Sequence, residues 1–251
     1  MKQLWRQVDE LLRNREGVFT ESSLGQLRAS RFLIASILLG ALYGCLMGMY
    51  GMFSRAAPEY RMILADVWKV PALFVLTLLI CFPSLYVFST LLGSRLPFRA
   101  TLNLLLATVT MTVTVLASLG PIVAFFSVST ESYNFMKLLN VAFFAVAGFL
   151  GVGALLKALQ SLIGQTVASA TPPPIPGVPP VMSRREELYT PQRQVRQLFR
   201  IWILIYALVG CQMGWVLRPF LGSPDLPFAW FRHRQANFFI DVWHSLANLF
   251  S

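Results

Sequence analysis

Five long stretches of this sequence carry no charged residue, and this feature limits the fold more than any other. The stretches are 32–53, 70–93, 101–130, 138–156 and 201–217. A transmembrane helix needs about 20 consecutive, mainly apolar residues. In lipid, a helix also satisfies its backbone hydrogen bonds within the segment. We therefore predict an all-α integral membrane protein with about five transmembrane helices.

Composition excludes the main soluble classes. The chain is 56% apolar and 13% charged, whereas a soluble domain carries roughly 25% charged residues. The net charge of +10 is divided into short clusters beside the apolar stretches. Such clusters orient helices and contact anionic lipid. We therefore expect the lipid bilayer as a partner and no nucleic acid.

The stretches and the breaks between them divide the chain into five parts. These are a cytoplasmic amphipathic segment (1–30), a four-helix transmembrane unit (31–160), a Pro-rich cytoplasmic linker (161–198), a fifth transmembrane helix (199–221) and an aromatic, Arg-containing tail with an amphipathic helix (222–251). The linker contains TPPPIPGVPP, which favours extended polyproline geometry. It is either a semi-rigid spacer or a segment that docks in an aromatic groove. Within the third stretch, Gly120-Pro121 is expected to end or kink the helix.

Loop charges predict the orientation. One side of the predicted topology has twice as many Lys and Arg residues as the other, and the basic side faces the cytoplasm. Five crossings would place the N-terminus in the cytoplasm and the C-terminus outside, most simply in a bacterial inner membrane. The fifth stretch is short, and if it does not cross, the tail lies inside. Apolar stripes in 1–15 and 239–250 indicate surface-lying helices, although packed core or partner helices give the same pattern.

Small residues recur at helical spacing in three of the stretches. One face of the first carries a residue of this kind every fourth position, and shorter pairs occur in the fourth and fifth. The residues are Ser36, Gly40, Gly44, Gly48, Ala147, Gly151, Gly210 and Gly214. Small residues let membrane helices approach closely. The partner helix is either internal or in another subunit, the latter including dimerisation through the first helix.

The five stretches contain no ionisable residue other than cysteine and tyrosine. Ion-coupled transporters and proton pumps usually keep an Asp, Glu, Lys, Arg or His at depth, so this absence argues against them. Thr108 and Thr112 share one helix face in the third stretch. Their hydroxyls either bond to backbone carbonyls and neighbouring helices, or line a path for a small solute.

The tail holds the candidate partner or lipid surface. This surface consists of Arg218, Trp230, Phe231, Arg232, Arg234, Trp243 and His244. Asp241 and His244 are three apart and form either an acid–base pair or the polar face of a surface helix. Two histidines and three dispersed cysteines, Cys45, Cys81 and Cys211, do not have zinc-site spacing, so we expect free thiols, no metal and no cofactor.

The layout resembles the Yip family of small multispanning proteins. The resemblance covers roughly residues 28–218, and PALFVLTLLICFPSLYVFSTLLG is its most similar phrase. It implies a cytoplasmic N-terminal region, five spans and a role in membrane traffic with Rab-type GTPases. The acidic-aromatic DLYGP-type motif of that family is absent before the first span. The phrase RPFLGSPDLPFAWFR resembles tails of uncharacterised bacterial membrane proteins.

These features favour a non-enzymatic membrane scaffold or accessory subunit of a larger complex. Its expected partners are other membrane-protein subunits or a second copy of the chain. A channel or permease for a small solute is the first alternative, and a membrane enzyme that uses the tail is the second. No catalytic residue is assigned.

Overall fold

A computed structural model describes most of the chain. It covers Arg6, Asp9, Arg13 and residues 29–53, 60–91, 98–170, 183–218, 220–221, 229–231 and 238–250. Side chains of 157–170 and most of 183–200 are not described. Four predictions lie wholly or mostly outside the described residues: the amphipathic stripe of 1–15, the polyproline segment, and the roles of Arg232 and Arg234.

Every described element is an α-helix, as predicted. The described helices are α3 (Ala29–Phe53), α4 (Tyr60–Leu91), α5 (Phe98–Ser129), α6 (Tyr133–Ala170), α7 (Ser183–Leu217) and α8 (Phe238–Phe250). Within the described part, α6 continues to Ala170 and α7 begins at Ser183, so both ends of the predicted linker 161–198 are helical.

Four of the described helices contain segments long and apolar enough to cross a membrane. The segments are Ala29–Phe53, Tyr60–Ser84, Thr101–Ser129 and Tyr133–Leu156. Ile201–Leu217 is a shorter apolar segment of α7. The second segment begins about ten residues before the predicted 70–93. The prediction was wrong because it started the helix after the charged residues Asp66 and Lys69, whereas α4 runs through both.

Proline does not end these helices. Pro121 lies inside α5, and Pro71 and Pro83 lie inside α4. The alternative that α5 ends at Gly120-Pro121 is therefore wrong. In lipid, neighbouring helices and side-chain hydroxyls can satisfy the backbone groups that a proline leaves unpaired.

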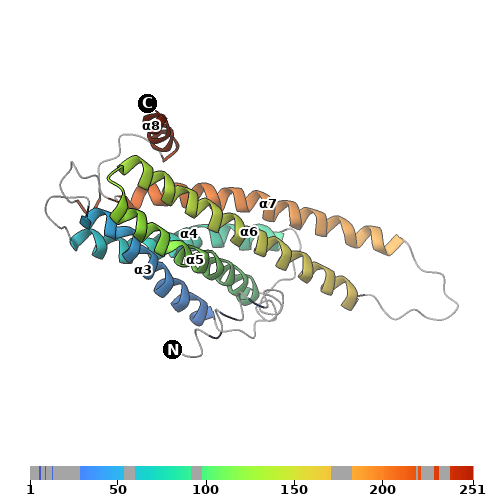
Figure 1. Cartoon of the computed structure of the whole chain (residues 1–251). Helices are drawn as coiled ribbons and strands as arrows, with labels where there is room; N and C mark the ends of the chain where they lie inside the picture. Colours follow the sequence, from blue (N-terminus) through green and yellow to red (C-terminus); the bar gives the residue numbers. More distant parts are fainter. Residues whose placement is uncertain are drawn as a thin grey trace.

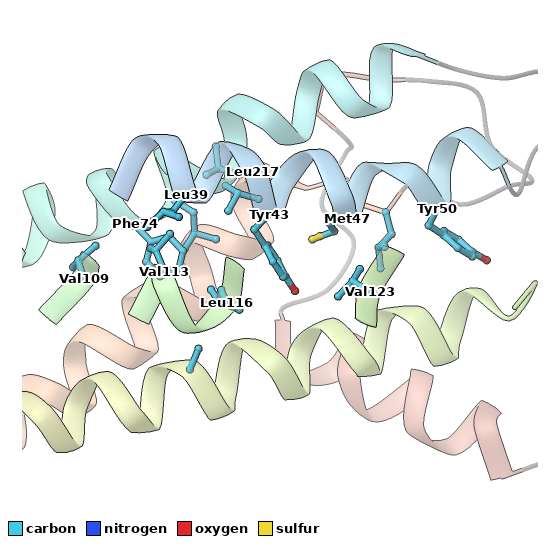
Figure 2. Close-up of a cluster of buried hydrophobic side chains, with 14 of the residues drawn as sticks. Leu39, Tyr43, Met47, Tyr50, Phe74, Val109, Val113, Leu116, Val123 and Leu217 are labelled. Carbon is cyan, nitrogen blue, oxygen red and sulfur yellow. The ribbon is translucent and has the colours of Figure 1, made fainter. Parts of the chain in front are cut away.

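The helix α3 buries one face in the bundle and exposes the other, which carries Leu38 and Leu42. It packs against α4 and α5, while α6 packs on α5, α7 on α4 and α8 on α6 (Figure 1). One face of α3 points Leu39, Tyr43, Met47 and Tyr50 into a buried apolar cluster (Figure 2). Side chains from α4, α5, α6 and α7 complete this cluster, which also includes Phe74, Val109, Val113, Leu116, Val123, Ala147 and Leu217. The core therefore joins five helices.

The two ends of the bundle differ. We call the end where α3, α5 and α7 finish and α4 and α6 begin the cap end, and α8 lies beside it (Figure 1). At the opposite end, α6 and α7 extend past the other helices (Figure 1). With 38 and 35 residues, they are about 57 and 53 Å long. Both exceed the roughly 30 Å hydrocarbon layer, so each needs room outside it.

Candidate functional site at the cap end

The glycines of α3 lie against the backbone of α4. A Cβ added at Gly44 would overlap the Asp66 carbonyl oxygen and lie 2.7 Å from its carbonyl carbon. At Gly48 it would lie 2.8 Å from the Ile63 Cα, and at Gly40 it would lie 3.3 Å from the Pro71 ring. This face of α3 is therefore occupied within the chain.

The other predicted small residues also have neighbours within the chain. A Cβ at Gly151 would overlap the Thr112 hydroxyl, and Ala147 is fully buried in the apolar cluster that contains Tyr43. On α7, a Cβ at Gly214 would lie 3.5 Å from a Leu73 methyl carbon, and one at Gly210 would lie 3.8 Å from a Thr77 methyl carbon. The space beside these two is looser, because both distances are ordinary van der Waals contact.

Three hydroxyls at seven-residue spacing tie α3 to α5, to α6 and to the turn between them. Ser36 Oγ lies 2.9 Å from Thr110 Oγ1 of α5. Tyr43 donates to Asn140 Oδ1 of α6 at 2.7 Å, and Tyr50 donates to the Glu131 carbonyl at 2.9 Å. Figure 2 shows both tyrosines pointing away from the same side of α3. These bonds fix α3 relative to α5 and α6.

The threonines of α5 bond within their own helix. Thr108, Thr110, Thr112 and Thr114 each donate to the carbonyl four residues earlier, at 2.7–3.0 Å. All four side chains are buried. The hydroxyls of Thr108 and Thr112 therefore bond to backbone carbonyls, the first of the two alternatives, and they do not line an open surface.

Two buried charged residues lie inside the second membrane-length segment, Tyr60–Ser84, outside the stretch predicted from the sequence. Asp66 and Lys69 both have 0% exposed surface. Neither carboxylate oxygen of Asp66 has a hydrogen-bond partner in the described structure. Its Oδ2 faces Gly48, at 3.2 Å from where a Cβ would lie. Both residues lie before the predicted stretch 70–93, so the absence of ionisable residues that argued against ion-coupled transporters and proton pumps does not hold for this segment.

Lys69 bonds to a distant part of the chain. Its Nζ donates to the Trp230 carbonyl oxygen at 2.7 Å and lies 5.4 Å from the centre of the Phe231 ring. Phe231 in turn makes an edge-to-face contact with Trp68, with ring centres 6.3 Å apart. We call residues 230–231 the strap. Side chains on a helix lean toward its N-terminus, so Lys69 reaches toward the cap end.

One feature of the sequence indicated that Asp66 could lie inside a helix. Apolar residues precede Asp66 (Met62-Ile63-Leu64-Ala65) and follow it (Val67-Trp68), so an apolar helix could begin near residue 60. The glycines facing Asp66 were visible as a stripe, but which helix they contact depends on the tertiary structure.

The described residues of the predicted tail surface are either half-buried, as Arg218 is, or exposed. The Arg218 guanidinium stacks 3.7 Å from the centre of the Trp215 ring. Trp230, Phe231, Trp243 and His244 are exposed.

Asp241 forms its ion pair with a residue of α6 and not with His244. Asp241 Oδ2 forms an ion pair with Lys137 Nζ of α6 at 2.9 Å, and His244 lies on the exposed side of α8. The geometry therefore gives Asp241 an anchoring contact to α6 rather than a bond to His244.

The described residues contain no group of three or more His, Cys, Asp or Glu side chains that could hold a metal ion. Cys45, Cys81 and Cys211 are free thiols. All three lie within apolar helical segments.

The fold defines the class of protein: an all-helical integral membrane protein with four helices able to cross the bilayer among the described residues. Comparisons with family models, with curated proteins and with solved structures find no match. The resemblance to the Yip family therefore remains a prediction, and function must be argued from the chain itself.

Proposed function

We propose that this protein is a non-enzymatic accessory subunit of a larger membrane complex, which it contacts with the exposed face of α8 and the strap. The observation that carries the proposal is the way in which α8 is held. Asp241 and Ser245 turn toward the body, while Phe239, Trp243 and Leu246 are exposed. The side of α8 that faces the body therefore carries Asp241 and Ser245 beside the half-buried Phe238 and Val242, while Phe239 and Trp243 face outward.

The interior supports a structural role over a permease. The threonines of α5 bond to their own backbone, and Ser36 and Tyr43 bond across to other helices. Such a core is a packed framework. The glycine faces are used inside the chain, so a partner contact belongs on another surface.

We further propose five crossings, with the N-terminus in the cytoplasm of a bacterial inner membrane. The apolar part of α7 supports the fifth. Trp202 donates to the Cys81 carbonyl at 3.0 Å, and Leu217 lies in the cluster that contains Tyr50 and Val70. The segment Ile201–Leu217 thus runs antiparallel to α4 from one end of the bundle to the other. Its 17 residues give about 25 Å of helix.

Site-specific photo-crosslinking in native membranes tests the partner proposal. A photoreactive amino acid at Trp243 should give a discrete covalent product with another polypeptide. The matched control is Phe149, an exposed aromatic residue (81%) within the membrane-length segment of α6, which should react with lipid. Purification in mild detergent should also yield a stoichiometric partner or a homo-oligomer. Lipid products alone at Trp243, together with a lone monomer, would contradict the proposal.

A further inference from the structure

The strongest unexplained feature is the carboxylate of Asp66. It is fully buried, both oxygens are unpartnered in the described structure, and it lies within a membrane-length helix segment. An isolated buried carboxylate is so costly that the group gives up its charge by binding a proton. Ionisable residues inside membrane segments are rare and mark functional sites.

Among the described residues, the charged group that acts on Asp66 is Lys69, one helical turn later on the same helix. On the α3 side, Asp66 faces Gly44 and Gly48, which have no side chain. The Lys69 ammonium donates a hydrogen bond to the Trp230 carbonyl. In this arrangement no ion pair joins Asp66 to Lys69.

Two of the groups near Lys69 can accept a hydrogen bond from its ammonium. The first is the Trp230 carbonyl, which the strap supplies from more than 160 residues away in the chain. The second is Asp66, which lies between Lys69 and the N-terminal end of α4, the direction in which the Lys69 side chain leans. If the strap leaves, the buried ammonium loses this acceptor, and the carboxylate one turn away is a charged group that can replace it.

We propose that Asp66 is a reversible proton-binding site whose occupancy is coupled to the strap through Lys69. With the strap in place, Asp66 is a neutral carboxylic acid and the Lys69 ammonium binds the Trp230 carbonyl. When the strap lifts, Lys69 pairs with the Asp66 carboxylate, and the O–H proton passes to water. One proton leaves for each strap that opens. The ligand of the site is therefore a proton.

A hydrophobic carbodiimide tests this proposal without an assay of function. The reagent attacks protonated carboxyl groups in apolar surroundings, and peptide mass spectrometry locates the adduct. The full chain is reconstituted in phosphatidylcholine and phosphatidylglycerol nanodiscs at neutral pH. Wild type should be modified at Asp66, while the ion-paired Asp241 remains unmodified, and Asp66→Asn should lose the adduct.

Two variants test the coupling. Phe231→Ala removes the ring that packs on Trp68 and lies over Lys69, so the strap should open more often and modification of Asp66 should fall. Lys69→Met removes the competing cation, so modification should equal or exceed that of wild type. Leu246→Ala, on the exposed side of α8, is the control and should leave modification unchanged.

Three outcomes would overturn the proposal. Wild type unmodified at Asp66 while Lys69→Met is modified would show a permanent ion pair. No modification in either would show that Asp66 carries no proton. Modification unaffected by Phe231→Ala would remove the coupling. Infrared spectroscopy gives an independent readout, because the carbonyl band of a protonated acid should be present in wild type and missing in Asp66→Asn.

Discussion

At the scale of single residues, glycine decides how closely α3 and α4 approach each other, because it has no side chain. Gly44 and Gly48 allow α3 to contact the α4 backbone around Asp66 and Ile63. In membranes, such packing replaces the hydrophobic drive, because lipid tails are as apolar as the side chains. A side chain in these positions would separate the helices that bury Asp66.

Gly44→Ala should therefore destabilise the protein, although alanine is the better helix former by about 1 kcal/mol. Overpacking typically costs about 1–3 kcal/mol, and here the new atom meets backbone, which cannot rotate away. Thermal unfolding in detergent, followed by near-UV circular dichroism, should show a lower midpoint. Gly148→Ala is the matched control, because nothing lies within 4 Å of its added Cβ. Equal midpoints for the two variants would contradict the prediction.

Tyr43 makes the hydrogen bond that joins α3 to α6. Tyr43→Phe should cost about 1 kcal/mol, because the Asn140 Oδ1 would lose its donor while buried. Denaturation in mixed micelles measures the loss, and a double-mutant cycle with Asn140→Leu isolates the pair. Tyr60→Phe, at an exposed tyrosine, should change stability little. Additive effects of the Tyr43 and Asn140 changes would argue against an energetic link.

At the scale of elements, α8 is attached to the bundle by few contacts. It packs on α6 with the side that carries Asp241 and Ser245, and the ion pair with Lys137 is its charged contact in the described structure. Aromatic residues fill much of its other side. An ion pair therefore helps to hold α8 on α6, while the exposed side of α8 is largely apolar. A helix packed on a soluble core has the opposite arrangement, with its apolar side inward.

Breaking that ion pair should loosen α8 without unfolding the bundle. The pair is partly exposed, so its loss should cost no more than about 1 kcal/mol. Lys137→Met should increase hydrogen exchange in α8 by up to roughly fivefold, with exchange in α3 unchanged. The charge swap Lys137→Asp with Asp241→Lys should restore protection. Unchanged exchange in Lys137→Met would show that other contacts hold α8.

At the scale of the whole molecule, the number of crossings decides on which side of the membrane the tail lies relative to the N-terminus. The apolar part of α7 pairs with α4 along the bundle, and we propose that it is the fifth crossing. The projecting ends of α6 and α7 then lie on the cytoplasmic side, with the basic residues of 184–200. The cap end, with Asp66, the strap and α8, lies on the other side.

Opposite placement of the chain ends follows from this topology. In a background where Cys45, Cys81 and Cys211 are alanine, Ser251→Cys should react with a membrane-impermeant maleimide on intact spheroplasts. Lys2→Cys should react only after permeabilisation, because the N-terminus is expected in the cytoplasm. Labelling of both from one face would mean an even number of crossings and would remove α7 as a span.

The sequence by itself determined the class of fold. Apolar segments without charge can satisfy their backbone only as helices in lipid, so the all-α membrane prediction and the positions of the segments in α3, α5 and α6 needed no tertiary information. It could not predict the start of α4, because Asp66 and Lys69 end an apolar stretch when residues are read one by one.

Only the tertiary structure decided that these charges are buried. Gly48 of α3 and the carbonyl of Trp230 reach Asp66 and Lys69 from distant parts of the chain, and shielding of a charge depends on such neighbours. The same holds for the stripe on α3, whose spacing indicated close packing but could not name α4 as the partner. Periodicity is a property of one helix, whereas the environment of a side chain is a property of the helices around it.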